Sequence, residues 1–257
     1  MSAWQSPLFR ASSKRDRNLV RALWRNVQQV SRTAWVVFFG GAALMAVYVY
    51  QGHHSFYTQH LAEPLFGKDP YNDWYRHLYQ FLSALLLLAV IPALLARFVL
   101  KRPLRAQGVQ LGDWRFGLRA VVVGILILTP LLYIGSFDPA IQREYPLTRL
   151  AGCATDLFIL WELTYLLYYI AWEYFFRGFN VFLVEEEWGV AAALLYQVIP
   201  STLLHIGKPE AETMAAVVGG VVFGALALRT RSMLYPLILH WYVGACTDFF
   251  SLLNMAR

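Results

Sequence analysis

Long stretches of the chain carry no charged side chain. The charge-free runs cover residues 33–62, 77–96, 120–137, 188–207, 213–228 and 232–247. A helix needs about 20 mostly apolar residues to cross the hydrocarbon core of a membrane. Several runs reach that length alone, and others reach it when a terminal arginine extends its charged head to the interface. The segment 157–184 is also apolar, apart from Glu162, Glu173 and Arg177.

This pattern predicts an all-α fold, a polytopic membrane helix bundle of about seven or eight transmembrane helices. We place the spans near 33–51, 77–98, 117–136, 157–184, 189–206, 211–229 and 233–253. The fourth span is longer than a bilayer requires, which is consistent with two helical pieces. Composition agrees, since 58% of the residues are hydrophobic and 15% are charged. These values exclude a disordered chain, a disulfide-stapled secreted module and a typical nucleic-acid binder.

The net charge of +6 is concentrated at one end of the chain. Residues 1–32 contain seven basic residues and one acidic residue, so the rest of the chain is neutral overall. We interpret residues 1–32 as a basic cytoplasmic N-terminal arm; the alternative is a solvated charge run that only sets topology. The positive-inside rule also puts the 99–116 loop and the Arg229–Arg231 turn in the cytoplasm and the 52–76 loop outside. The chain is therefore expected in the cytoplasmic (inner) membrane, with no nucleic-acid partner.

The segment after residue 208 shows two local signals of helix structure. Pro209, followed by Glu210 and Glu212, is typical of a first helical turn, where acidic side chains face the positive end of the helix dipole. Small residues then recur at a spacing of four, which lets another helix approach closely. These residues are Ala216, Gly220 and Gly224. We expect this stripe to serve internal packing rather than a dimer face.

A few ionisable residues fall inside the predicted spans, where an unpaired charge is costly and each one is a functional candidate. They are Glu162, Glu173, Arg177, His205, His240 and Asp248. Glu173 and Arg177 are four residues apart, so they can form an ion pair on one helix face. An imidazole can move a proton or stabilise an oxyanion, which makes His205 and His240 candidates for catalysis.

Several short motifs in the last 110 residues resemble those of the CPBP family. This family comprises intramembrane endopeptidases, including CAAX-processing and bacteriocin-processing enzymes, also called Abi proteins. The motifs are Trp172-Glu173-Tyr174-Phe175-Phe176-Arg177-Gly178, Leu203-Leu204-His205, the run from Gly219 to Arg229 with Ser232, and Pro236-Leu237-Ile238-Leu239-His240. The resemblance covers roughly 150–250. We therefore divide the chain into the arm, N-terminal transmembrane helices over 33–149, and a CPBP-like protease core over 150–253.

The resemblance implies a glutamic-type protease that cleaves membrane-associated or lipidated protein substrates at the bilayer. In that mechanism Glu173 deprotonates a water molecule, and His205 holds or shares it. His240 stabilises the oxyanion, and Arg177 orients Glu173. No cofactor is expected. A zinc site built from the two histidines and a glutamate is the alternative, although the HExxH motif is absent.

The chain departs from the family's motifs at three positions. Trp172 stands where the family has a first glutamate, to which water activation is usually assigned. Ser201 replaces an aromatic residue four before His205, and Gly244 replaces the asparagine four after His240. Asp248 is one further turn along, but its helical phase differs by roughly 80°.

Two other functions stay open on these residues. A catalytically inactive relative would act as a membrane binding or chaperone-like partner, as the changes at Trp172 and Gly244 suggest. A transporter or proton pathway would use Glu162 and Glu173, which share one helix face, but no inverted repeat supports it. Four aromatic residues could line a substrate cavity, but packing is the more usual role of such a pattern. They are Trp161, Tyr165, Tyr168 and Tyr169.

Overall fold

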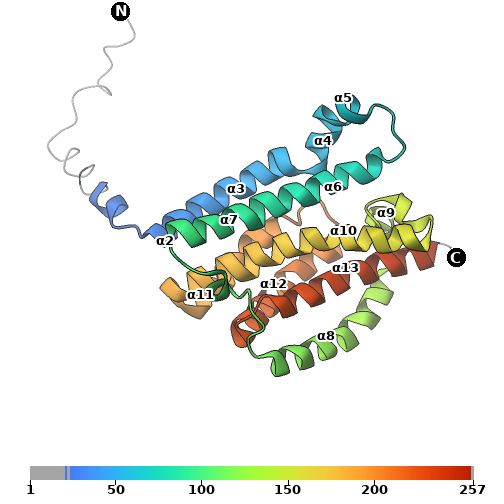
Figure 1. Cartoon of the computed structure of the whole chain (residues 1–257). Coiled ribbons are helices and arrows are strands. Elements are labelled where there is room, and N and C mark those ends of the chain that lie inside the picture. The colour runs from blue at the N-terminus through green and yellow to red at the C-terminus, as the bar shows by residue number, and fades with distance from the viewer. Residues whose placement is uncertain (1–20, 22–23, 256–257) are drawn as a thin grey trace, which may run out of the picture.

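The computed structural model describes residue 21 and residues 24–255 (Figure 1). This part of the chain is helical throughout its long segments and contains no β-strand, which confirms the all-α fold class. Most of the predicted N-terminal arm lies outside the described residues.

The first two long helices combine α-helical and π-helical turns. The first runs over Arg32–Gly52 and the second over Asn72–Val99. The first is made of α2 (Arg32–Ala34), η3 (Trp35–Gly40), α3 (Gly41–Val47) and η4 (Tyr48–Gly52). The second is made of α6 (Asn72–Ala84), η5 (Leu85–Val90), α7 (Ile91–Leu94) and η6 (Leu95–Val99). Short helices α4 (His54–His60) and α5 (Ala62–Phe66) connect the two.

Within the described residues, four helices are long and apolar enough to cross a membrane. Besides the first two, they are α8 (Trp114–Gly135) and α12 (Glu210–Thr230). The remaining long helices are α10 (Thr155–Glu173), α11 (Val181–Leu203) and α13 (Leu234–Met255). They lie in the same bundle (Figure 1), and α10 and α11 hold three acidic residues each. The predicted number of spans is thus supported for four helices and stays a prediction for the others.

The chain from α10 to α11 forms one long rod that breaks at a glycine. The π-helical segment η9 (Tyr174–Asn180) joins the two α-helices without a turn. Gly189 then adopts φ 83° and ψ 174°, which interrupts the helix. Only glycine adopts such a positive φ without steric cost. The break separates the two predicted spans 157–184 and 189–206.

Small residues bring α12 against α11, as predicted. A Cβ atom on Gly224 would lie 2.8 Å from a methyl carbon of Leu194, and one on Gly220 would lie 3.1 Å from a methyl carbon of Val198. The stripe therefore serves packing inside the bundle. The core centres on η9, whose Phe175 has no exposed surface.

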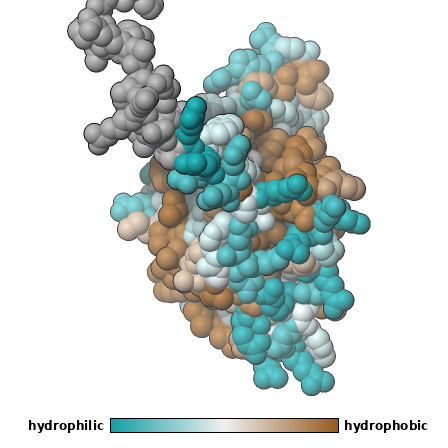
Figure 2. Space-filling view, turned by 90° about the vertical axis from the view of Figure 1, so that its left-hand side faces the viewer, coloured by the Kyte–Doolittle hydropathy of each residue, from teal (hydrophilic) through white to brown (hydrophobic). Residues whose placement is uncertain are grey.

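Charged side chains close one end of the bundle. Arg229 pairs with Asp113 at 3.0 Å, and Arg231 pairs with Glu185 at 2.7 Å. Arg102 also pairs with Glu186 there. Figure 2 looks onto this end and shows polar side chains across it, with apolar residues along the flanks. We call it the arginine-rich end. The opposite end carries α4, α5, the 3₁₀ turn η8 (Arg149–Gly152) and α9 (Pro139–Glu144); the 3₁₀ turn η7 (Leu104–Gln107) lies in the loop before α8.

Candidate active site

Glu173 lies at the end of α10 and has no exposed surface. Its Oε1 atom is 2.6 Å from Nδ1 of His240 on α13 and 3.1 Å from a guanidinium nitrogen of Arg177. An ionised carboxylate only accepts hydrogen bonds, so Nδ1 of His240 is the donor. The neutral imidazole then keeps its lone pair on Nε2.

Arg177 follows Glu173 by one turn and is 3% exposed. Burying an ion pair is costly unless both charges are matched, and here the carboxylate has two cationic or N–H partners. The guanidinium carbon also lies 5.7 Å from the ring centre of Phe223 on α12. The predicted i,i+4 ion pair therefore forms, and it links α10 to both α12 and α13.

His205 follows the end of α11 and is held by backbone contacts. Its Nδ1 lies 2.7 Å from the carbonyl oxygen of Ser201, so this nitrogen donates and Nε2 is the acceptor. Trp172 packs edge-on against the imidazole, with ring centres 5.2 Å apart. Two of the departures from the family motifs therefore contact His205 itself. The indole of Trp172 packs against the imidazole ring. Ser201, at the position of the family's aromatic residue, orients the imidazole through its backbone carbonyl.

The third departure, Gly244, makes room for a tyrosine. A Cβ atom at this position would lie 1.9 Å from the hydroxyl oxygen of Tyr169. Tyr169 also packs edge-on against His240, with ring centres 4.9 Å apart. The tyrosine hydroxyl therefore occupies the space into which a side chain at residue 244 would point.

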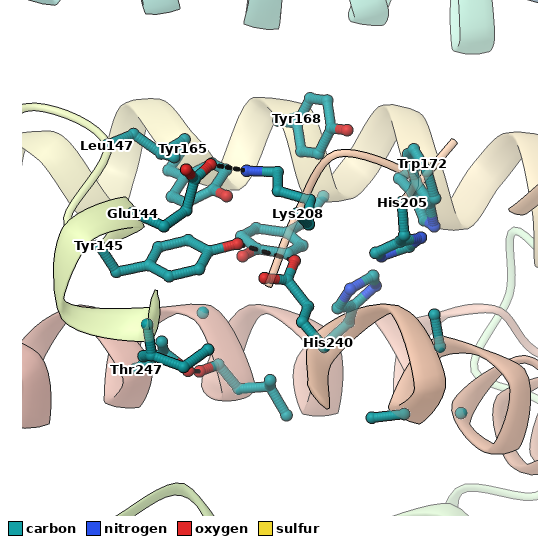
Figure 3. Close-up of a pocket in the computed structure, with 18 of the residues that line it drawn as sticks. Glu144, Tyr145, Leu147, Tyr165, Tyr168, Trp172, His205, Lys208, His240 and Thr247 are labelled. Carbon is teal, nitrogen blue, oxygen red and sulfur yellow. Dashed lines mark hydrogen bonds and ion pairs between the residues drawn. The ribbon is translucent and has the colours of Figure 1, made fainter. Parts of the chain in front are cut away.

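A central cavity of about 790 Å³ lies beside these residues. His205 and His240 lie side by side at one end of it, next to Trp172 (Figure 3). Glu173 and Arg177 are not among its lining residues, and Glu173 is connected to the cavity by its contact with His240. Tyr165, Tyr168 and Tyr169 line it, which corrects the expectation that these aromatic residues only pack. For Trp161, which is fully buried away from the cavity, that expectation is confirmed.

Residues 154–246 match the family described as type II CAAX prenyl endopeptidase Rce1-like. This segment is similar to Rce1-like domains. The match spans all four predicted site residues and confirms the resemblance to CAAX-processing proteases. No curated protein and no solved structure matches the chain significantly. The chain is therefore an integral membrane protein that carries a domain of a protease family.

The cavity also contains the carboxylate of Glu212, which the sequence pattern indicated only as part of a first helical turn. Glu212 lines the cavity and accepts a hydrogen bond from the hydroxyl of Tyr145 at 2.8 Å. Burial raises the pKa of Tyr145 well above its ordinary value, so the phenol keeps the proton that it donates. Lys208 and Glu144 form an ion pair at 2.7 Å nearby (Figure 3). The signal in the sequence that could have identified Glu212 is the short turn that joins His205 to α12.

Three histidines line the cavity at the end opposite the arginine-rich end. The rings of His53 and His54 are 4.0 Å apart, and those of His54 and His77 are 5.2 Å apart. Burial, with a smaller contribution from His53, lowers the pKa of His54 to about 4, so this side chain is neutral at pH 7. His77 is 3% exposed, and neither ring nitrogen has a partner among the described residues. The cavity therefore offers unused polar groups to an incoming molecule.

The other two acidic candidates from the sequence, Glu162 and Asp248, form a separate buried pair. Asp248 is fully buried and accepts a hydrogen bond from the indole of Trp161 at 2.8 Å. Glu162 faces it and is 6% exposed. Neither residue lines the cavity. Asp248 thus points away from His240 and does not replace the missing asparagine at Gly244.

Metal-ligating side chains do not gather in the described part of the chain. Over residue 21 and residues 24–255, no group of three or more His, Cys, Asp or Glu side chains is arranged to hold a metal ion.

Proposed function

We propose that the chain is an intramembrane endopeptidase that hydrolyses peptide bonds of membrane-associated or lipidated protein substrates. The observation that carries the proposal is the orientation of His240. One ring nitrogen is bound to the buried carboxylate of Glu173, and the imidazole lines a cavity large enough for a peptide segment. A carboxylate that orients an imidazole in this way is a recurrent arrangement in hydrolytic sites.

In the proposed reaction Glu173 activates water through His240. The water oxygen attacks the scissile carbonyl carbon while its proton passes to Nε2 of His240. The resulting imidazolium is stabilised by Glu173, and its positive charge lies next to the developing oxyanion. His205, whose Nε2 is an acceptor, holds the same water. Arg177 supplies the positive charge that balances the carboxylate.

The proposed partners are the bilayer and a peptide that enters the cavity from one side of it. The cavity is lined by residues of the end opposite the arginine-rich end, among them His53 and Glu144. If the arm over 1–32 lies in the cytoplasm, as the positive-inside rule predicts, the cavity opens on the outer side of the cytoplasmic (inner) membrane. Substrates would then be cut on that side. The division of the chain near residue 150 stays a prediction.

The test is cleavage of lipidated and transmembrane-tail peptides in reconstituted membranes by wild type, Glu173→Gln and Glu162→Gln. Glutamine keeps the shape of the carboxylate but cannot stabilise the imidazolium, so Glu173→Gln should lose roughly 10²–10⁴ in rate. Glu162→Gln is the matched control on the same helix, because Glu162 is buried but does not line the cavity. Equal cleavage by wild type and Glu173→Gln would contradict the assignment of Glu173.

A second candidate function is peptide binding without cleavage. It is favoured by Trp172, whose indole packs against His205 at the position of the family's first glutamate. If wild-type protein crosslinks to the test peptides at cavity residues but cleaves none of them, this second function is supported over the first.

A further inference from the structure

Glu212 differs from Glu173 in facing the cavity directly. It is among the cavity-lining residues, whereas Glu173 is not. One carboxyl oxygen of Glu212 accepts the Tyr145 hydroxyl, and the other is buried and has no partner among the described residues. His240 lines the same cavity. The cavity is therefore lined by both the imidazole of His240 and an incompletely bonded carboxyl group.

The position of Glu212 is tied to that of His205. The hydroxyl of Thr213 donates to the carbonyl oxygen of His205 at 2.9 Å, and the backbone N–H of Lys208 donates to the same carbonyl at 3.0 Å. Gly207 adopts φ +102° in this turn, a conformation that favours glycine. Residues 205–213 thus hold the imidazole and the carboxyl group in one compact unit.

Nearby cations do not form a salt bridge with Glu212. Lys208 pairs with Glu144 instead, and in the described part of the chain no arginine or lysine nitrogen lies within ion-pair distance of Glu212. A buried carboxyl group without a cationic partner is stabilised as the neutral acid. A neutral carboxyl group carries a proton that it can donate. The leaving amine of a peptide bond must gain such a proton.

The proposed peptidase reaction leaves one proton transfer unassigned. His240 takes a proton from the attacking water, but the amine that leaves must gain one as the carbon–nitrogen bond breaks. Resting on the proposed function, we propose that Glu212 is a further catalytic residue, the general acid that protonates the leaving amine.

The transfers balance over one cycle. The carbon–nitrogen bond breaks with its electron pair on nitrogen, and that nitrogen takes the proton from Glu212. Glu212 is left as a carboxylate. The imidazolium of His240, which carries the water's proton, returns it to Glu212 through the cavity. The net change is the addition of one water across the peptide bond. Tyr145 keeps the carboxyl group oriented through its hydrogen bond.

The experiment compares a peptide with its ester analogue, in which the scissile amide nitrogen is replaced by oxygen. An alkoxide leaves without full protonation more readily than an amide anion, so the ester depends less on an acid. Glu212→Gln keeps the hydrogen bond from Tyr145 but cannot deliver a proton. It should lose roughly 10²–10⁴ in rate on the amide and less than about tenfold on the ester. Glu173→Gln should slow both substrates equally, because it affects attack on the carbonyl.

Glu210→Gln is the control variant. Glu210 lies in the same first turn of α12 but is exposed and does not line the cavity, so both rates should equal those of wild type. An equal loss on amide and ester in Glu212→Gln, or no loss on either, overturns the assignment of Glu212 while the proposed function stands. Cleavage of neither substrate by wild type overturns both.

Discussion

The Nδ1 atom of His240 lies 2.6 Å from Oε1 of Glu173, although the two residues are 67 positions apart in the chain. The contact joins the end of α10 to α13 in the centre of the bundle. It fixes which nitrogen of His240 carries the proton, and so which nitrogen is free to accept one. Every proposed step at the cavity depends on this orientation.

We first predict that Glu173 and His240 act as one unit. His240→Gln and Glu173→Gln should each reduce peptide cleavage strongly, and the double variant should be little slower than the slower single variant. Residues that perform one step together show this non-additivity. Rates from membrane-reconstituted protein provide the measurement. Losses that multiply in the double variant would mean that the two side chains act in separate steps.

Removing Arg177 should destabilise the protein, because Glu173 would lose the charge that balances it. Breaking a buried pair by removing one partner costs roughly 3–5 kcal/mol. We expect Arg177→Met to lower the free energy of unfolding in detergent by about that amount. Arg229→Met is the matched control, since the Arg229–Asp113 pair is exposed. Its cost should stay below about 1 kcal/mol. Similar losses in both variants would argue against a tightly packed Glu173 site.

Adding one methyl group at Gly244 should disturb the site. The new Cβ of Gly244→Ala would overlap the Tyr169 hydroxyl, and overpacking of this kind costs roughly 1–3 kcal/mol. Tyr169 would have to move away from His240, so cleavage should fall as well. Gly40→Ala is the control, because a Cβ there meets no atom closer than 3.8 Å and Gly40 does not line the cavity. Thermal unfolding and cleavage rates of the two variants provide the comparison, and Gly244→Ala should cost less stability in a Tyr169→Phe background, where the overlapping hydroxyl is gone.

The orientation in the membrane can be tested with a native thiol. Cys153 is exposed at the cavity end, and the chain has one other cysteine, Cys246. In a Cys246→Ser background, an impermeant maleimide added to intact cells should label Cys153. Arg105→Cys in a cysteine-free background should be labelled only after the cells are opened. The reverse pattern would place the cavity on the cytoplasmic side.

Cleavage should persist after prolonged treatment with a metal chelator. The proposed steps use carboxyl and imidazole groups, and none of them requires a Lewis acid. Activity and metal content of the purified protein would be measured before and after chelation. The zinc site would be favoured instead if the active protein holds stoichiometric zinc, loses activity when the zinc is removed and regains activity when zinc is added back.

Sequence patterns alone determined the helical class, the segments that form the long helices, and several of their ends. Charge-free runs mark the helices because the backbone of a membrane helix is satisfied within the segment, so its signal is local. Pro209 begins α12 and Gly220 packs against α11 for reasons that are equally local. The Glu173–Arg177 pair follows from helical spacing.

Only the tertiary structure decided which groups meet in the cavity. It placed Glu173 behind His240 rather than in the cavity, filled the space at Gly244 with Tyr169, and brought Glu212 to Tyr145 across 67 positions. Each of these contacts joins two segments whose relative rotation, tilt and depth are set by the packing of the whole bundle. Hydropathy reports that a helix is apolar, but not where each polar side chain on it points.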